Sequence, residues 1–196
     1  MSKLVYGVGF NDRSRPTWVD GKRVKEYDLW HSMIQRCYSE KFQNNHTAYK
    51  GCSVSNNFLN YSFFYDWCQE QVGFKSIDKK GRHYQLDKDI LSDKDKTYSE
   101  TTCVFLPAEI NSFFADCGNN KWDYRVGVYF DKHRNKFATV CRVDGGKKVG
   151  FFNTAQEAFL KYKSVKEALC KELALKWKDE IDHRVFESMM NWEVKE

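Results

Sequence analysis

The chain has 196 residues, 41% of them hydrophobic and 16% aromatic, which is enough for one large domain or two small ones with real cores. No apolar run reaches the roughly 18 residues of a transmembrane helix, and the N-terminus lacks a signal-peptide core, so we expect a cytoplasmic protein without a membrane partner. Seven cysteines without a Cys-x-x-Cys pair argue against a zinc cluster or a disulfide framework and favour buried, reduced thiols.

The formal net charge of +5 is unevenly distributed. Residues 119–175 carry 12 Lys and Arg against 6 Asp and Glu, whereas residues 1–118 are nearly balanced and residues 176–196 are acidic. A local positive excess suits a polyanionic partner, and a solvated basic face has the same composition. Charge alone therefore leaves both interpretations open.

Helical spacing of apolar residues predicts two amphipathic helices in the N-terminal half. The first covers residues 27–39, "YDLWHSMIQRCYS". In the second, aromatic residues repeat every three or four positions from Phe58 to Cys68, with Asn56 or Asn57 as the N-cap. We expect these aromatic side chains to form a core and not a base-stacking platform.

The stretch "YQLDKDIL" begins a second pattern, with short strands expected near residues 83–91 and 102–106. Pro107 suits the first turn of a helix that runs "AEINSFFADC". The polar, glycine-bearing segment 118–123 that follows is the best boundary between domains.

Beyond this joint, "YRVGVYF", "KFATVCRV" and "KKVGFF" predict three antiparallel strands joined by the turn sequences "DKHRN" and "DGG". Thr154 caps a long helix whose apolar stripe would cover one face of this sheet and leave the other face open. A short acidic helix ends the chain. The expected fold class is α+β, with domains at 1–118 and 119–175 and a helical tail at 176–196.

The C-terminal half carries a recognisable set of residues in order: Tyr-Arg, Gly-Val, a hairpin, Lys-aromatic-Ala, then Gly-x-Phe-x-Thr-x-x-Glu-Ala and a late tyrosine. On these residues the segment 124–175 resembles the Apetala-type DNA-binding domain of plant transcription factors and phage mobile endonucleases. The resemblance implies that the exposed sheet face enters the major groove of double-stranded DNA. The side chains implied to contact DNA are Arg125, Tyr129, His133, Arg134, Lys136, Arg142, Lys147 and Lys148.

The sequence departs from this family where arginines are usual after Gly-Val. Tyr129 and Asp131 stand there instead, which alters the expected base specificity, while the number of Lys and Arg preserves affinity for phosphates. A sheet-and-helix unit that binds protein is the alternative.

The motifs "WHSMIQRCY", "AYKGCSVSNNF" and "LDKDIL…TYSETTCVFLPAEIN", spread over about residues 27–115, resemble bacteriophage HNH-type (His-Me finger) endonucleases. In such proteins an HNH-like unit often precedes an Apetala-type domain. The resemblance implies a ββα-metal unit in which strand, loop, strand and helix hold one Mg²⁺ or Mn²⁺ ion. The implied ligands are Asp87 on the strand and Asn111 on the helix, both with the hard oxygen atoms that such ions prefer.

Lys88 stands where this family places its general-base histidine, and three interpretations are open. Lys88 itself could be the base if its pKa were lowered. An imidazole could come from His83, which lies about 13 Å from Asp87 along an extended strand, or from His46. The centre could also have lost cleavage, leaving the residues around Lys88 as a surface salt-bridge cluster.

Together these features predict a site-directed, divalent-metal-dependent DNA endonuclease of the phage homing type, acting in the host cytoplasm. A catalytically inactive DNA-binding regulator derived from such a nuclease is the first alternative. An interaction protein that inhibits a host factor is the second.

Overall fold

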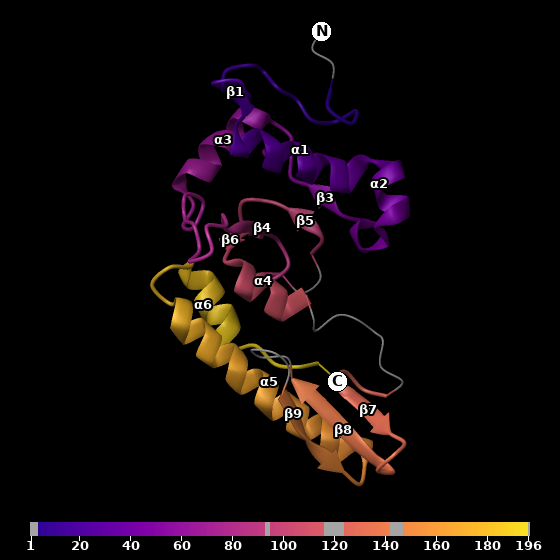
Figure 1. Ribbon diagram of the computed structural model, residues 1–196. Helices are drawn as coiled ribbons and strands as arrows, with labels where there is room; N and C mark the ends of the chain where they lie inside the picture. Colours follow the sequence, from indigo (N-terminus) through magenta and orange to yellow (C-terminus); the bar gives the residue numbers. More distant parts are fainter. Residues whose placement is uncertain (1–3, 93–94, 116–123, 142–146, 196) are drawn as a thin grey trace. The chain divides into compact units, whose positions relative to one another are not determined.

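The computed structural model describes residues 4–92, 95–115, 124–141 and 147–195 and shows a mixed α+β chain (Figure 1). The chain divides into two compact units. The first comprises Met1–Ala108 and Glu180–Val185, and the second comprises Glu109–Asp179 and Phe186–Glu196.

Helices of the first unit surround an aromatic core. They are α1 (Lys25–Tyr38), α2 (Glu40–Asn45), the 3₁₀ helix η1 (Thr47–Tyr49) and α3 (Tyr61–Glu70). Trp30 of α1 is fully buried, and its indole N–H donates a hydrogen bond to the carbonyl oxygen of Phe58 over 2.8 Å. Phe58 in turn packs edge-on against Phe64 of α3, with ring centroids 5.1 Å apart. The expectation that these aromatic residues form a core is confirmed.

The start of α3 differs from the prediction. Its N-cap is Asn60, whose side-chain oxygen accepts the backbone N–H of Ser62, and residues 56–59 form a turn before it. An N-cap at Asn56 or Asn57 was wrong because the buried Phe58 belongs to this turn and not to the helix. The helix α2 begins where the Ser39 hydroxyl accepts the N–H of Phe42.

The strands of the first unit form three small pairs. They are antiparallel β1 (Trp18–Val19) with β2 (Lys22–Arg23), parallel β3 (Ser53–Val54) with β5 (Thr97–Tyr98), and antiparallel β4 (Gln85–Asp87) with β6 (Val104–Leu106). The strand expected to reach residue 91 stops at Asp87. It stops there because the Asp87 carboxylate accepts the backbone N–H groups of the next turn, which bends the chain away from β6.

The second unit contains the expected three-stranded meander and its covering helix. Its elements are α4 (Ala108–Ala115) apart from its first residue, β7 (Val128–Asp131), β8 (Lys136–Cys141), β9 (Lys147–Phe152), α5 (Ala155–Trp177) and the C-terminal part of α6 (His183–Met190), whose first three residues belong to the first unit. The strands pair in the order β7-β8-β9, all antiparallel. As expected, Thr154 caps α5, and Glu157 completes a reciprocal capping box with it.

The sheet packs on α5 through a compact apolar core. Its fully or nearly fully buried members are Val128, Cys141, Ala158, Phe159, Tyr162 and Val194. Gly127 has a φ of +76° and lies directly against the Tyr162 ring, and its carbonyl oxygen accepts the buried Thr139 hydroxyl over 2.7 Å. A side chain at this position would have no room, so the glycine allows the close contact between strand and helix.

Side-chain contacts tie α4 to α5 within the second unit. The Glu109 carboxylate accepts hydrogen bonds from Lys176 over 2.7 Å and from the Trp177 indole over 2.9 Å. The ammonium of the buried Lys166 donates to the Phe113 carbonyl oxygen over 3.3 Å and lies 3.6 Å from that residue's ring centroid. The division between the units consequently lies at residues 108 and 109, ahead of the joint expected at 118–123.

The cysteines of the described segments agree with the prediction of reduced thiols. Six of them, Cys37, Cys52, Cys68, Cys103, Cys141 and Cys170, are free and buried. Burial raises the pKa of the Cys37 thiol to about 12, so this group is uncharged and unreactive at neutral pH. Of the helices described, none combines the length and apolar character that crossing a bilayer requires.

Candidate functional site

Asp87 ends β4 directly opposite Val104 of β6. One of its carboxylate oxygens accepts the backbone N–H groups of Asp89 and Ile90, each over 2.9 Å. Burial raises the pKa of Asp87, and the charge of Asp89 adds to this effect, while the two backbone hydrogen bonds and Lys88 oppose it. The carboxyl group that the sequence predicts as a metal ligand is therefore rigidly placed and poorly solvated.

Lys88 is a buried cation and is only 5% exposed. Its ammonium donates to the Asp89 carboxylate and lies 5.5 Å from the centroid of the Tyr98 ring. Burial by itself lowers the pKa of Lys88, but the hydrogen bond and charge of Asp89 outweigh burial and hold this pKa above its ordinary value. A lysine in this state is protonated at neutral pH, which argues against Lys88 as a general base and favours an electrostatic role.

The two candidate histidines occupy other positions in the first unit. His83 is exposed, and its backbone forms a bridge with Ile77, whereas Asp87 pairs with β6. His46 is exposed at the end of α2 and stacks on Phe42 with ring centroids 4.4 Å apart. Within the described ranges no three His, Cys, Asp or Glu side chains form a group that could hold a metal ion, so His83, Asp87 and Asp89 do not make such a cluster.

Asn111 lies on α4 in the second unit, while Asp87 lies in the first. The two predicted ligands therefore belong to different compact units. The donor chemistry suits Mg²⁺ or Mn²⁺, because hard cations of this size are commonly held by one or two protein oxygens together with water and substrate phosphate. Such a site needs no cluster of three carboxylates or imidazoles.

The sheet of the second unit presents a face away from α5. Because successive residues of a strand point to opposite faces, the buried Val128 and Cys141 mark the helix side, and their neighbours mark the open side. One row across this face is formed by Tyr129, Ala138 and Phe151, which are partners in the strand register; Tyr129 is half-buried, and its neighbours cover Ala138 completely. Phe151 is 40% exposed. The sequence analysis did not name Phe151. It lies between Gly150 and Phe152, which are on the helix side, so alternation along the strand places Phe151 on the open face.

Cations flank this aromatic row. The Arg134 guanidinium lies 4.7 Å from the centroid of the Phe151 ring and forms an ion pair with Asp131 over 3.2 Å. Lys136 is the cross-strand partner of Asp131, and its ammonium donates to the Asn153 side chain. The structure thus brings Tyr129, Arg134 and Lys136 of the predicted set to one face of the sheet.

The other members of the predicted set have different surroundings. His133 is exposed in the turn between β7 and β8. Arg125 is exposed before β7, with its guanidinium 5.0 Å from the ring centroid of Phe159. Arg142 lies outside the described residues, and Lys147 and Lys148 belong to β9, where their side chains are not described.

Comparison with protein-family models, curated proteins and solved structures found no match to this chain.

Proposed function

We propose that this protein binds double-stranded DNA through the open face of the β7–β9 sheet. The observation that carries the proposal is the arrangement of Tyr129 and Phe151 in one row with Arg134 and Lys136 beside them, on the face that α5 leaves uncovered. The major groove is about 12 Å wide and admits β-strands. In that position the cations would meet phosphates and the aromatic rings would meet base edges.

Surface partners hold the two cations without burying them. Arg134 is ordered by Asp131 and by the Phe151 ring, and Lys136 by Asn153. The guanidinium is the exposed member of its pair, since the Arg134 side chain is 57% exposed and the Asp131 side chain 10%, and Lys136 is held by a neutral amide, so both cations can approach a phosphate. The accessibility of the two cations favours a surface that binds a polyanion over one whose charges serve only internal salt bridges.

The second candidate function is that of a site-directed, metal-dependent DNA endonuclease of the phage homing type. It is favoured by the order of elements: β4 pairs antiparallel with β6, and α4 follows immediately, as the HNH-like ββα-metal unit requires. Asp87 ends the first strand, as a strand ligand of this unit should. Asp87 would hold Mg²⁺ or Mn²⁺, and the bound ion would polarise the scissile phosphate.

Lys88 decides between this candidate and a DNA-binding regulator that does not cut. As a protonated ammonium it would attract a phosphate and could not take a proton from the attacking water. Cleavage therefore needs a proton acceptor other than Lys88. DNA binding by the sheet does not depend on this step.

The test is incubation of the full chain with phage and plasmid duplexes in Mg²⁺ or Mn²⁺, beside the Asp87→Ala and Lys88→Ala variants. Salt-dependent binding supports the DNA-binding proposal. Cleavage by the wild type that is lost in Asp87→Ala supports the endonuclease, while binding without nicking in either metal leaves the regulator. Absence of salt-dependent DNA binding contradicts both and leaves the interaction protein that targets a host factor.

A further inference from the structure

The hairpin β1–β2 in the first unit is a short and well-defined structure. Trp18 pairs with Arg23 and Val19 pairs with Lys22, and the chain reverses at Asp20 and Gly21. Both turn residues have positive φ, +49° and +73°, as the tight type I′ hairpin turn requires, and Asp-Gly is a favoured pair for it. The turn chemistry fixes which side chains lie opposite one another.

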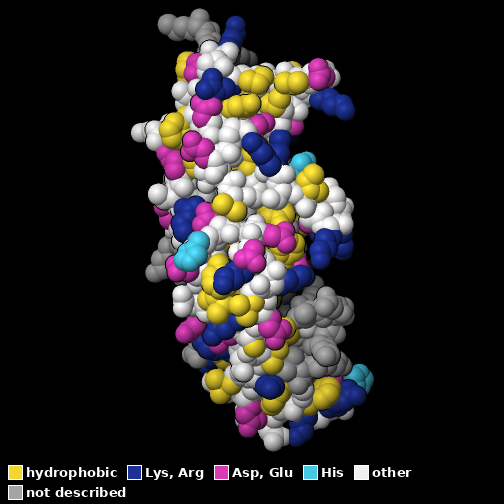
Figure 2. All heavy atoms as spheres, turned by 90° about the vertical axis from the view of Figure 1, so that its left-hand side faces the viewer, with side chains coloured by type: hydrophobic (Ala, Val, Ile, Leu, Met, Phe, Trp, Pro, Cys, Tyr) yellow, Lys and Arg dark blue, Asp and Glu magenta, His cyan; other side chains and the backbone are white. Residues whose placement is uncertain are grey.

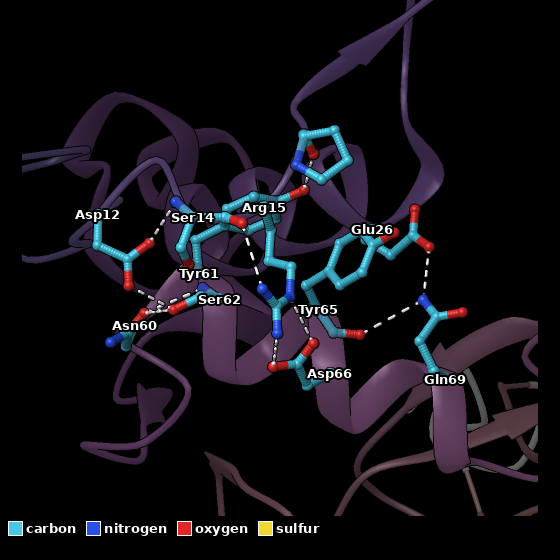
Figure 3. Close-up of polar contacts among 11 residues, drawn as sticks. Asp12, Ser14, Arg15, Glu26, Asn60, Tyr61, Ser62, Tyr65, Asp66 and Gln69 are labelled. Atoms are coloured by element: carbon cyan, nitrogen blue, oxygen red, sulfur yellow. Dashed lines mark hydrogen bonds and ion pairs between the residues drawn. The ribbon is translucent and has the colours of Figure 1, made fainter.

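Strands of two residues are too short to be stable alone, so the hairpin depends on how its base is held. Arg15 makes a two-pronged ion pair with Asp66 of α3, at 2.7 and 2.8 Å, and the Tyr61 hydroxyl donates to the Pro16 carbonyl oxygen over 2.6 Å (Figure 3). Planar guanidinium–carboxylate pairs restrain orientation as well as distance. The segment leading into the hairpin is thus fastened to a helix of the core.

This fixed hairpin exposes large apolar side chains. Trp18 is 58% exposed and Val19 is 52% exposed. The Arg23 guanidinium lies 6.0 Å from the centroid of the Trp18 ring and 5.0 Å from that of Tyr27. On the face drawn in Figure 2, hydrophobic side chains lie among Lys, Arg, Asp and Glu side chains. An exposed tryptophan on a rigid support is a feature of binding surfaces, because burial on a partner releases its hydration.

The charges near the two apolar residues identify the kind of partner. Each apolar side chain has a cation as its cross-strand neighbour: Lys22 lies opposite Val19, and Arg23, which also pairs with Asp28 over 3.2 Å, lies opposite Trp18. Trp and Arg are also common in protein–protein interfaces, but lysine is depleted there, and Lys and Arg beside an apolar wedge are typical of proteins that press into the grooves of DNA.

We infer that the β1–β2 hairpin is a second DNA-contacting element, with Trp18 as an apolar wedge against the base steps and Lys22 and Arg23 on the flanking phosphates. This inference rests on the proposed DNA-binding function and adds a contact from the first unit to the one made by the sheet. A wedge of this kind partly unstacks a base step and bends the duplex.

The experiment measures affinity of the full chain for short mixed-sequence duplexes by fluorescence anisotropy over a range of salt concentrations. Trp18→Ala should weaken binding about tenfold and leave the salt dependence unchanged, because stacking carries no charge. The double variant Lys22→Ala/Arg23→Ala should lower the slope of log K against log salt by about two. DNA bending measured by energy transfer between the duplex ends should be reduced in Trp18→Ala.

Matched controls are Ile77→Ala, which removes a side chain that is 55% exposed, and Lys79→Ala/Lys80→Ala, which removes two exposed cations from the same unit. Both should bind as the wild type does. If Trp18→Ala binds and bends DNA like the wild type while the sheet variant Lys136→Ala is weakened, the hairpin inference is overturned and the proposed function stands. If the wild type itself does not bind duplex DNA, the proposed function fails and the hairpin inference with it.

Discussion

The candidate nuclease strand and the open sheet face both combine acids, cations and aromatic rings, but they use their charges differently. Around Asp87 the groups satisfy one another: the carboxylate accepts two backbone N–H groups, and the buried Lys88 is held by Asp89. On the sheet, the Arg134 guanidinium and the Lys136 ammonium stay at the surface, although Asp131, the partner of Arg134, is itself only 10% exposed. Acids beside a lysine in the sequence therefore do not by themselves indicate a reactive centre, since the lysine's neighbours keep it protonated.

The largest expected effect is that of Asp87→Asn on the rate of DNA cleavage. In Asp87→Asn we expect any metal-dependent cleavage to fall several hundred-fold, because a bound ion supplies several kcal/mol of charge stabilisation to the reaction. The fold should survive, since the amide oxygen can still accept the N–H groups of Asp89 and Ile90. Cleavage rates and thermal unfolding of the same preparations provide the measurement. Unchanged cleavage would remove Asp87 from the metal site.

The same variant has a defined pH dependence. Burial raises the pKa of Asp87 in the native state, so the native protein binds this proton more tightly than the unfolded chain does. The wild type should therefore lose free energy of unfolding as pH rises from the unfolded pKa of about 3.9 through the raised native value. Asp87→Asn should lack this loss. Denaturant titrations between these pH values test the sign, and a loss of equal size in both proteins would contradict it.

The next effect tests the covered face of the sheet. A Cβ at Gly127 would lie 2.4 Å from the Tyr162 ring, and the backbone has a φ of +76°. We expect Gly127→Ala to lower the free energy of unfolding by about 3 kcal/mol, as overpacking and backbone strain add. Gly81→Ala is the control, because φ is +75° there but no atom lies within 4 Å, and it should lose only about 1 kcal/mol. Equal losses in chemical denaturation would show that Tyr162 tolerates the methyl group.

A smaller effect is expected on the open face. Lys136→Ala should weaken duplex binding by about 1 kcal/mol for all sequences alike and lower the salt slope by about one, as loss of one phosphate contact predicts. Affinity at several salt concentrations gives both numbers. Lys161→Ala, which removes an exposed lysine from α5, is the matched control. Identical slopes for Lys136→Ala and the wild type would place the DNA elsewhere on the protein.

The smallest effect concerns the buried lysine of the nuclease strand. Lys88→Met should change the free energy of unfolding at neutral pH by less than about 1 kcal/mol, because the Asp89 side chain is 71% exposed and stays hydrated without its partner. The pKa of Lys88 is raised in the native state, so its stabilising contribution is complete below the unfolded pKa of about 10.4 and is lost as pH rises above it. The wild type should thus lose stability relative to Lys88→Met at alkaline pH, as measured by denaturant titration. Parallel curves would contradict the raised pKa.

Local sequence signals predicted the regular elements of the second unit well. Alternating β-branched and aromatic residues, two turn sequences and the Thr154–Glu157 capping pair specify the meander and the start of α5 from neighbouring residues alone. The same kind of signal, Asp20-Gly21 between two short runs, was present for the β1–β2 hairpin and was not used.

Contacts between distant residues account for what the prediction missed. The parallel pairing of β3 with β5 joins segments more than forty positions apart in the sequence, and no local pattern specifies it. Lys166 lies on the buried side of α5, where the apolar stripe was expected, because the Phe113 carbonyl and ring receive its ammonium. Asn60 replaces the predicted caps of α3 because Phe58 is drawn into the core before the helix starts.

Periodicity, turn residues and burial preference are enough to predict the α+β class, the buried thiols and the antiparallel sheet with one face left open. The state of the charged groups instead depends on the three-dimensional arrangement of the chain. Whether Lys88 is a base or a fixed cation depends on burial and on the carboxylate that faces it, and whether Arg134 and Lys136 share a surface with Phe151 depends on the strand register. The protonation of Lys88 and the grouping of Arg134 and Lys136 with Phe151 both depend on which residues are close in space, and the order of residues in the chain does not specify this.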